Sequence, residues 1–195
     1  METILELKSI AYDYGVPKYA GQTMTKADFL RWESDDNYVY ELDNGILEPT
    51  TGMKQEEILM LKQLTRRFQR TSAYEREGEL VGEMDVVLLN DQVRRPDVAY
   101  YTGEQIQLIA TGVTAIPGFV VEFGSVTDNE LTSIKKRHEY FDAGVQVVWW
   151  VFPLYKEVYV YTSPKTVTIC TDDDVLSAAP ALPELQMTVA DLFKR

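Results

Sequence analysis

The sequence predicts an α/β fold in which a mixed β-sheet is flanked by helices. The first observation is the order of segments: a long helical pattern precedes a β-rich stretch, and a second one interrupts the later strands. The second is residues 145–152, which are apolar on both faces, as expected of a central strand covered by helices on each side. The third is composition, because 195 residues with 45% hydrophobic and 26% charged side chains are typical of a globular domain with a substantial core.

The N-terminal region is predicted to lead into a single domain. Residues 1–23 are weakly patterned and indicate an arm, which leaves residues 24–195 as one domain without an internal repeat or a linker. Thr25-Lys26-Ala27-Asp28 resembles a capping box and is expected to begin a short helix that runs through Trp32.

A hairpin and the first long helix follow. Asn44-Gly45 is typical of a tight turn between two strands, because this pair readily takes positive φ. The next helix is predicted over residues 54–70, with one apolar face formed by Ile58, Leu61, Leu64 and Phe68.

The rest of the chain alternates strands and helices. Thr127-Asp128-Asn129-Glu130 predicts the start of the second long helix, which is expected to end near Ala143-Gly144. A short helix is expected over residues 188–193. The predicted strands are residues 80–89, 93–101, 118–123 and 145–152, followed by a hairpin of residues 157–162 and 166–170.

Charge and composition narrow the function classes. The net charge of −12 argues against a broad basic surface that wraps duplex DNA, although it leaves room for a local basic cleft or for metal-assisted phosphate binding. No apolar run approaches the ~20 residues of a membrane span, and the N-terminus lacks the features of a signal peptide. We therefore expect a cytoplasmic protein with no membrane association.

The cysteine and histidine content excludes several chemistries. Cys170 is the only cysteine, which rules out a disulfide within the chain and fits a reducing compartment. His138 is the only histidine, which argues against histidine-metal nucleases and against most Ser-His and Cys-His arrangements.

Two carboxylates lie in segments that otherwise have the pattern of buried sheet. Asp97 follows Arg95-Pro96 within one predicted strand, and Glu122 lies among Val120, Val121 and Phe123 in the next. Burying an unpaired carboxylate costs several kcal/mol, so such a group usually meets a metal or a cation, or has a raised pKa. Neighbouring strands about 4.8 Å apart can bring both carboxylates to one ion. The pair predicts a divalent-metal site for phosphodiester hydrolysis, since Mg²⁺ prefers carboxylate oxygens.

Lys136 on the second long helix is the candidate cation for this site. Leu131, Ile134 and Phe141 form one apolar stripe, and Lys136 points away from it together with Tyr140. Two interpretations remain open: this second face meets the polar centre of the sheet, or Lys136 is solvated. Spacing alone favours the solvated face.

Residues from about 40 to 192 resemble the Uma-type restriction endonuclease family, a branch of the PD-(D/E)xK nuclease superfamily. In that family the lysine of the usual E-x-K motif has moved from the strand to the following helix, and here the position two after Glu122 is Gly124. The matching segments are Tyr40-Glu41-Leu42, Gly45, Arg95-Pro96-Asp97-Val98-Ala99, Val121-Glu122, Ser125, Asp128, Lys136, Tyr140, Ala143-Gly144-Val145, Val148-Trp149, Leu182-Pro183 and Val189-Ala190-Asp191-Leu192.

The resemblance implies a restriction-endonuclease-like fold and a DNA substrate. Asp97 and Glu122 then correspond to the ligands of Mg²⁺ or Mn²⁺, and Lys136 to the residue that stabilises charge or orients water. Weaker site candidates are Glu41 in the first hairpin, Gln55 where the family commonly has histidine, and Tyr140. A homodimer is also implied, because double-strand cleavage needs two sites.

The chain departs from the family pattern at several positions. Gly124 replaces a leucine, Ser125-Val126-Thr127 replaces Ser-Pro-Ser, and Phe152 replaces an aspartate. These departures and the acidic charge favour an alternative function, in which a nuclease-fold module has lost activity and serves as a binding or assembly subunit. Retention of Asp97, Glu122 and Lys136 favours an endonuclease.

Overall fold

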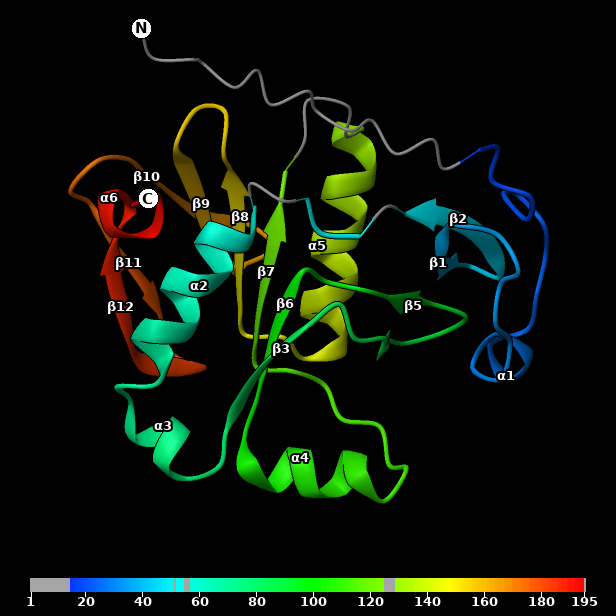
Figure 1. The fold of residues 1–195 in the computed structure, drawn as a ribbon, viewed down its shortest axis with the longest axis horizontal. Coiled ribbons are helices and arrows are strands. Elements are labelled where there is room, and N and C mark those ends of the chain that lie inside the picture. Colours follow the sequence, from blue (N-terminus) through cyan, green and yellow to red (C-terminus); the bar gives the residue numbers. More distant parts are fainter. Residues whose placement is uncertain (1–14, 51, 55–56, 125–128, 195) are drawn as a thin grey trace, which may run out of the picture.

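The structure is a computed structural model, and it describes residues 15–50, 52–54, 57–124 and 129–194. Within these residues the main sheet has six strands in the order β10-β9-β8-β7-β6-β3. The strands are β3 (Glu79–Gly82), β6 (Val98–Tyr101), β7 (Phe119–Phe123), β8 (Val147–Phe152), β9 (Glu157–Ser163) and β10 (Thr166–Cys170). Two long helices, α2 (Glu57–Phe68) and α5 (Glu130–Ala143), cover opposite faces of this sheet (Figure 1).

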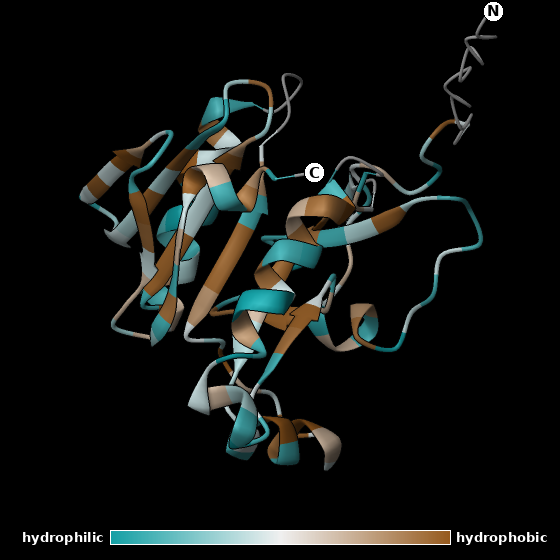
Figure 2. Cartoon of the chain, turned by 60° about the vertical axis from the view of Figure 1, so that its left-hand side comes forward, coloured by the Kyte–Doolittle hydropathy of each residue, from teal (hydrophilic) through white to brown (hydrophobic). Residues whose placement is uncertain are grey.

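The centre of the sheet is a parallel pair. β7 runs parallel to β8, whereas the other neighbouring strands are antiparallel, so the sheet is mixed as predicted. β8 is buried on both faces, which confirms the central strand expected from residues 145–152. Trp149 lies on the α2 side and Trp150 on the α5 side. Figure 2 shows long hydrophobic stretches on the strands, whereas the helices alternate hydrophobic and hydrophilic bands.

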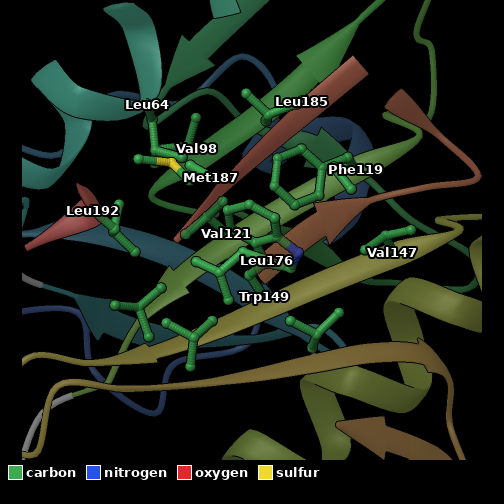
Figure 3. Close-up of a cluster of buried hydrophobic side chains, with 14 of the residues drawn as sticks. Leu64, Val98, Phe119, Val121, Val147, Trp149, Leu176, Leu185, Met187 and Leu192 are labelled. Atoms are coloured by element: carbon green, nitrogen blue, oxygen red, sulfur yellow. The ribbon is translucent and has the colours of Figure 1, made fainter. Parts of the chain in front are cut away.

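The larger core lies on the α2 side of the sheet (Figure 3). It joins Met60, Leu64 and Phe68 of α2 to alternate residues of the central strands, among them Val121 and Trp149. Ile58, expected on the apolar face of this helix, is instead exposed, and Met60 takes the buried position. The buried face of α2 packs against the sheet and against β12 and α6 of the C-terminal region, and Ile58 lies outside this face.

The other long helix buries a polar face, contrary to the predicted stripe. Leu131 is 75% exposed, whereas Glu139 and Tyr140 are buried. The apolar-stripe prediction for this helix was therefore wrong at Leu131. The buried face is the one that carries Glu139 and Tyr140, and these side chains pair with Arg94 and Glu122. The helix begins after its N-cap Asn129 and ends at Gly144, whose φ of 110° suits glycine. Thr127 and Asp128 lie outside the described residues.

A smaller four-stranded sheet lies beside α5 (Figure 1). Its order is β2-β1-β5-β4, from β1 (Val39–Asp43), β2 (Ile46–Thr50), β4 (Val86–Val87) and β5 (Val93–Arg94). The β1–β2 hairpin turns at Asn44-Gly45, as predicted. Helix α1 (Lys26–Phe29) is capped by the Thr25 side chain, also as predicted, but it ends before Trp32.

The two long strands predicted at residues 80–89 and 93–101 are each divided between the two sheets. β3 and β6 belong to the six-stranded sheet, whereas β4 and β5 belong to the smaller one. Pro96 lies at the second break, where a residue without an N–H cannot continue a ladder. Glu83, with φ of 50°, lies at the first break. The chain thus crosses between the sheets just before Asp97.

Some elements were absent from the predicted set. These are α3 (Ser72–Glu75), α4 (Gly103–Ala110) and the hairpin of β11 (Val175–Ala178) and β12 (Leu182–Thr188). The hairpin of β9 and β10 and the short C-terminal helix α6 (Val189–Leu192) agree with prediction. Among the described residues, no helix is both long and apolar enough to cross a membrane.

Candidate functional site

A cavity of about 450 Å³ opens where β6 and β7 meet α5. Asp97, Glu122 and Lys136 all line it, although they come from the segment just before β6, from β7 and from α5. The structure therefore brings together the three residues that the sequence selected. Glu57, Arg95 and Trp150 contribute further parts of the wall.

The strand register places Asp97 beside Glu122. Val98 pairs with Val121 across the antiparallel β6–β7 ladder, so one step further along the same register brings Asp97 opposite Glu122. The Phe123 N–H donates to Asp97 Oδ2 at 2.6 Å, which fixes the orientation of the carboxylate. Burial and then the nearby charge of Glu122 raise the pKa of Asp97 to about 8, whereas the Phe123 hydrogen bond opposes the rise.

Glu122 is buried on the α5 side of β7. The Tyr140 hydroxyl donates to Glu122 Oε1 at 2.5 Å, so Tyr140 joins the site as a hydrogen-bond donor. Burial raises the pKa of Glu122, and the neighbouring Lys136 ammonium partly offsets this rise.

The Lys136 side chain extends from α5 into the cavity and does not point into solvent. Its side chain is only 16% exposed, and its Nζ lies 2.9 Å from Glu41 Oε1. Burial alone would lower the pKa of Lys136, but the carboxylates of Glu122 and Glu41 raise it above the ordinary value. The solvated-face interpretation is therefore wrong. The reason is that this face of α5 meets the polar centre of the molecule, an arrangement that helix periodicity alone does not reveal.

Glu41 is more central than its weak sequence signal indicated. Besides Lys136, its carboxylate accepts from Arg95 N at 2.9 Å and from Arg94 Nη1 at 3.3 Å. Glu41 lies on β1 of the smaller sheet, so it connects that sheet to the lysine of α5. We assign it as a residue that positions Lys136.

Arg94 was missed by the sequence reasoning, although it is only 1% exposed. Its guanidinium pairs with Glu139 at 2.7 Å and with Asp43 at 3.3 Å, in addition to Glu41. Gln92 Nε2 donates to Glu139 Oε1 at 2.6 Å, which adds a further bond to the network. The one sequence feature that could have indicated a buried Arg94 is its place in a predicted strand, directly after the apolar Val93.

Glu57 was also missed. It is buried at the start of α2, lines the same cavity, and its charge contributes to the raised pKa of Asp97. Its Oε2 accepts from Lys54 N at 2.7 Å. A glutamate in the first turn of a helix is normally explained by the helix dipole, which is why its sequence position gave no signal. Gln55, the weak candidate near this position, lies outside the described residues.

Comparison with known proteins identifies the family. Residues 27–190 match the sequence profile of Uma2, described as "Putative restriction endonuclease". The chain belongs to the Uma2 family. The fold of this Uma2 protein is similar to the crystal structure of "a putative nuclease belonging to DUF820" from Anabaena variabilis. That match has a TM-score of 0.74 and 17% sequence identity, and it covers 87% of this chain and 97% of the other. A search of curated proteins found no match.

The match confirms the resemblance and the restriction-endonuclease-like fold predicted from the sequence. In this Uma2 protein, two departures from the family pattern are spatially related. A Cβ added at Gly124 would lie 2.7 Å from the Phe152 ring, so the larger side chain at position 152 occupies space that glycine at position 124 leaves. Segment 125–127, the third departure, lies outside the described residues.

The donor set of this Uma2 protein fits a hard divalent cation held mainly by two carboxylates. Asp97 and Glu122 are buried side by side with raised pKa values, and a cation between them would relieve both the repulsion and the desolvation. Mg²⁺ suits such a site because it keeps several of its waters and needs only one or two carboxylates. In the described part of the chain, no group of three or more His, Cys, Asp or Glu forms a fuller metal cage.

Proposed function

We propose that this protein is an endonuclease that hydrolyses phosphodiester bonds of DNA with Mg²⁺ or Mn²⁺. The observation that carries the proposal is the convergence of Asp97, Glu122 and Lys136 on one cavity. Family membership supports the same chemistry, since the description of the Uma2 family is "Putative restriction endonuclease".

Each residue has a role that follows from its environment. Asp97 and Glu122 would hold the metal, which when bound supplies an activated water and charge stabilisation at the phosphate. The Phe123 N–H and the Tyr140 hydroxyl orient these two carboxylates. Lys136, kept protonated by Glu122 and Glu41, places a positive charge against the non-bridging oxygens as charge develops on them.

Positive charge concentrated in the carboxylate cavity would allow this acidic chain to bind DNA. The net charge of −12 excludes strong general attraction to DNA, so binding depends on the metal, Lys136 and nearby cations such as Arg95. We therefore expect affinity for DNA to rise with Mg²⁺ and to be weak in its absence.

Nicking of supercoiled plasmid with Mg²⁺, and with EDTA in its place, tests the proposal directly. We expect nicked and linear products only with the metal. Asp97→Asn should abolish nicking, because it removes one metal-binding charge while keeping a carbonyl oxygen to accept from Phe123 N. Asp173→Asn removes an exposed carboxylate from the turn after β10 and is the matched control.

Lys136→Met is the second arm of the test, with the exposed Lys62→Met as its control. Loss of nicking in Lys136→Met, with Lys62→Met active, would support the assigned role. Wild-type protein that neither nicks DNA nor binds Mg²⁺ by calorimetry would instead favour the alternative of a degenerate module that serves binding or assembly.

We further propose a homodimer as the active form and a cytoplasmic location. The dimer follows from the chemistry, because one site per chain cuts one strand. A C₂ arrangement would also let the small basic patches of Arg66, Arg67 and Arg70 on two copies act on one duplex.

A further inference from the structure

A second cavity, of about 360 Å³, adjoins the carboxylate cavity. Ser133 and Trp150 line both, so the two spaces share a wall. This volume lies in the range of small-molecule sites, roughly 300–1,000 Å³. The remaining wall residues come from α5, β8 and β9 and are Glu130, Ile134, Arg137, Phe152 and Tyr161.

The walls of this second cavity are rich in aromatic rings. Trp150, Phe152 and Tyr161 all contribute to its surface. Phe152 is held by an edge-to-face contact with Tyr159, with ring centroids 4.9 Å apart. The absence of a side chain at Gly124 makes room for the Phe152 ring. Such walls suit a flat ligand that stacks on aromatic faces.

Arg137 provides an unused hydrogen-bond donor in the same place. Its guanidinium lies over the Tyr161 ring, 4.8 Å from the centroid. Its Nε is buried, yet it meets no hydrogen-bond acceptor anywhere in the described ranges. An unsatisfied buried donor costs about 1–3 kcal/mol, so a small rotation of the guanidinium that brings it to a ligand acceptor would recover that free energy.

The charges favour a neutral ligand over an anion. Arg137 and Glu130 are the two charged residues in the wall and have opposite signs, so the cavity lacks the excess of cations that a phosphate needs. A nucleobase has the required properties, because it offers a π-face to the rings and carbonyl or ring-nitrogen acceptors to Arg137.

We propose that this second cavity binds one unstacked nucleobase of the DNA strand whose phosphate occupies the carboxylate cavity. The inference rests on the proposed nuclease function and specifies how the protein binds one base of the DNA substrate. Arg137 donates to an acceptor on the base edge, and Tyr161 and Phe152 supply the stacking surfaces. The base is drawn out of its stack beside the scissile phosphate.

The test compares two end-labelled single-stranded oligonucleotides by fluorescence anisotropy in EDTA and at low salt. No cleavage is then involved, and the weak metal-free affinity is strong enough to measure. One has all its bases, and the other has the same length but abasic central nucleotides. Because stacking contributes about 1–3 kcal/mol per base, wild-type protein should bind the abasic strand about 5- to 150-fold more weakly. This comparison alters the probe and not the protein.

The variants locate the effect. Arg137→Met keeps the aliphatic stem, and Tyr161→Leu removes a ring at a half-buried position; each should lose most of the discrimination between the two strands. Arg31→Met and Tyr155→Leu change exposed residues outside the cavity, so both variants should keep the wild-type discrimination between the two strands. Circular dichroism melting checks that each variant is folded.

Equal affinity of wild-type protein for both strands, or no binding of either, would overturn the proposal, and so would unchanged discrimination in folded Arg137→Met and Tyr161→Leu. Plasmid nicking with Mg²⁺ is measured separately. Base-dependent binding without nicking would contradict the nuclease function alone, whereas nicking without base-dependent binding would contradict the base cavity alone.

Discussion

At the scale of single residues, the decisive feature is a pair of carboxylates at the junction of β6 and β7. Asp97 and Glu122 are each costly to ionise because both are buried, and the charge of Glu122 adds to the cost of ionising Asp97. Such a pair is unfavourable for the stability of the metal-free fold. A divalent cation that binds the two carboxylates would offset this cost and would therefore stabilise the folded protein.

The raised pKa of Asp97 gives a pH prediction for the metal-free protein. Its pKa rises from the usual value of 3.8 to about 8, so folding takes up a proton between these values. This contribution to the free energy of unfolding is therefore greatest at low pH and declines as pH rises through that window, by at most about 1.4 kcal/mol per pH unit. Asp97→Asn removes the titrating group.

Urea unfolding of both proteins in EDTA between pH 5 and about 8.5 measures this difference. We expect Asp97→Asn to gain stability relative to the wild type as pH rises. Parallel pH profiles for the two proteins would show that Asp97 does not titrate in this window.

Tyr140 gives a prediction about metal affinity. Tyr140→Phe removes the hydroxyl that donates to Glu122 and leaves the ring in place. A hydrogen bond to a charged group contributes about 1.5–3 kcal/mol, so its loss makes the ionised form of Glu122 less stable. A higher Mg²⁺ concentration is then needed to occupy the site. We expect the Mg²⁺ concentration for half-maximal nicking to rise roughly tenfold or more. An unchanged Mg²⁺ requirement would exclude this role, and Tyr155→Phe, at an exposed position, is the control.

At the scale of elements, the site depends on how α5 is attached to the smaller sheet. Arg94 of β5 pairs with Glu139 of α5 and with Glu41 and Asp43 of β1. Lys135 of α5 pairs with Asp43 as well. These ion pairs add to the apolar contacts that Tyr140 and Phe141 make with the six-stranded sheet. Together they hold the part of α5 that carries Lys136 beside the two carboxylates.

Removing the central cation of this network should therefore be costly. Arg94→Met removes one cationic partner from each of three carboxylates, and Glu139 loses its closest one. Breaking a buried pair in this way typically costs about 3–5 kcal/mol. Arg31→Met removes an arginine whose pair with Asp28 is exposed, so it should leave the free energy of unfolding nearly unchanged. Urea denaturation of both variants measures the difference. A loss under about 1 kcal/mol for Arg94→Met would show that hydration compensates for the lost pairs.

At the scale of the whole molecule, the six-stranded sheet ends in an exposed edge strand. β10 is mostly exposed and includes Val167 and Ile169, two large apolar residues at that edge. An unpaired edge of this kind is a template for pairing with a second copy. Repulsion between acidic chains is limited by screening over about 8 Å at physiological salt.

We expect light scattering at micromolar concentration and physiological salt to give twice the mass of one chain. Ile169→Lys should shift the protein to the monomer, because a charge on the pairing edge opposes strand addition. A monomer mass for the wild type would contradict the dimer and would leave single-strand nicking as the most that one chain can do.

The sequence alone determined the central architecture and the two carboxylates. Residues 145–152 were apolar on both faces, which a strand can satisfy only between two helix layers, and β8 lies there. Asp97 and Glu122 were conspicuous because a buried strand has few reasons to carry an acid. The hydrophobic pattern is local, so these features can be read without knowledge of distant contacts.

Only the tertiary structure decided what surrounds the pair. Periodicity placed Lys136 in solvent, because the charged network that receives its face of α5 comes from residues about 40 to 95 positions away. The split of the two long strands, the buried Arg94 and the role of Glu57 depend equally on partners distant in sequence. Electrostatic pairing has no periodic signature along the chain, whereas burial of apolar side chains does, and this difference explains which features could be predicted.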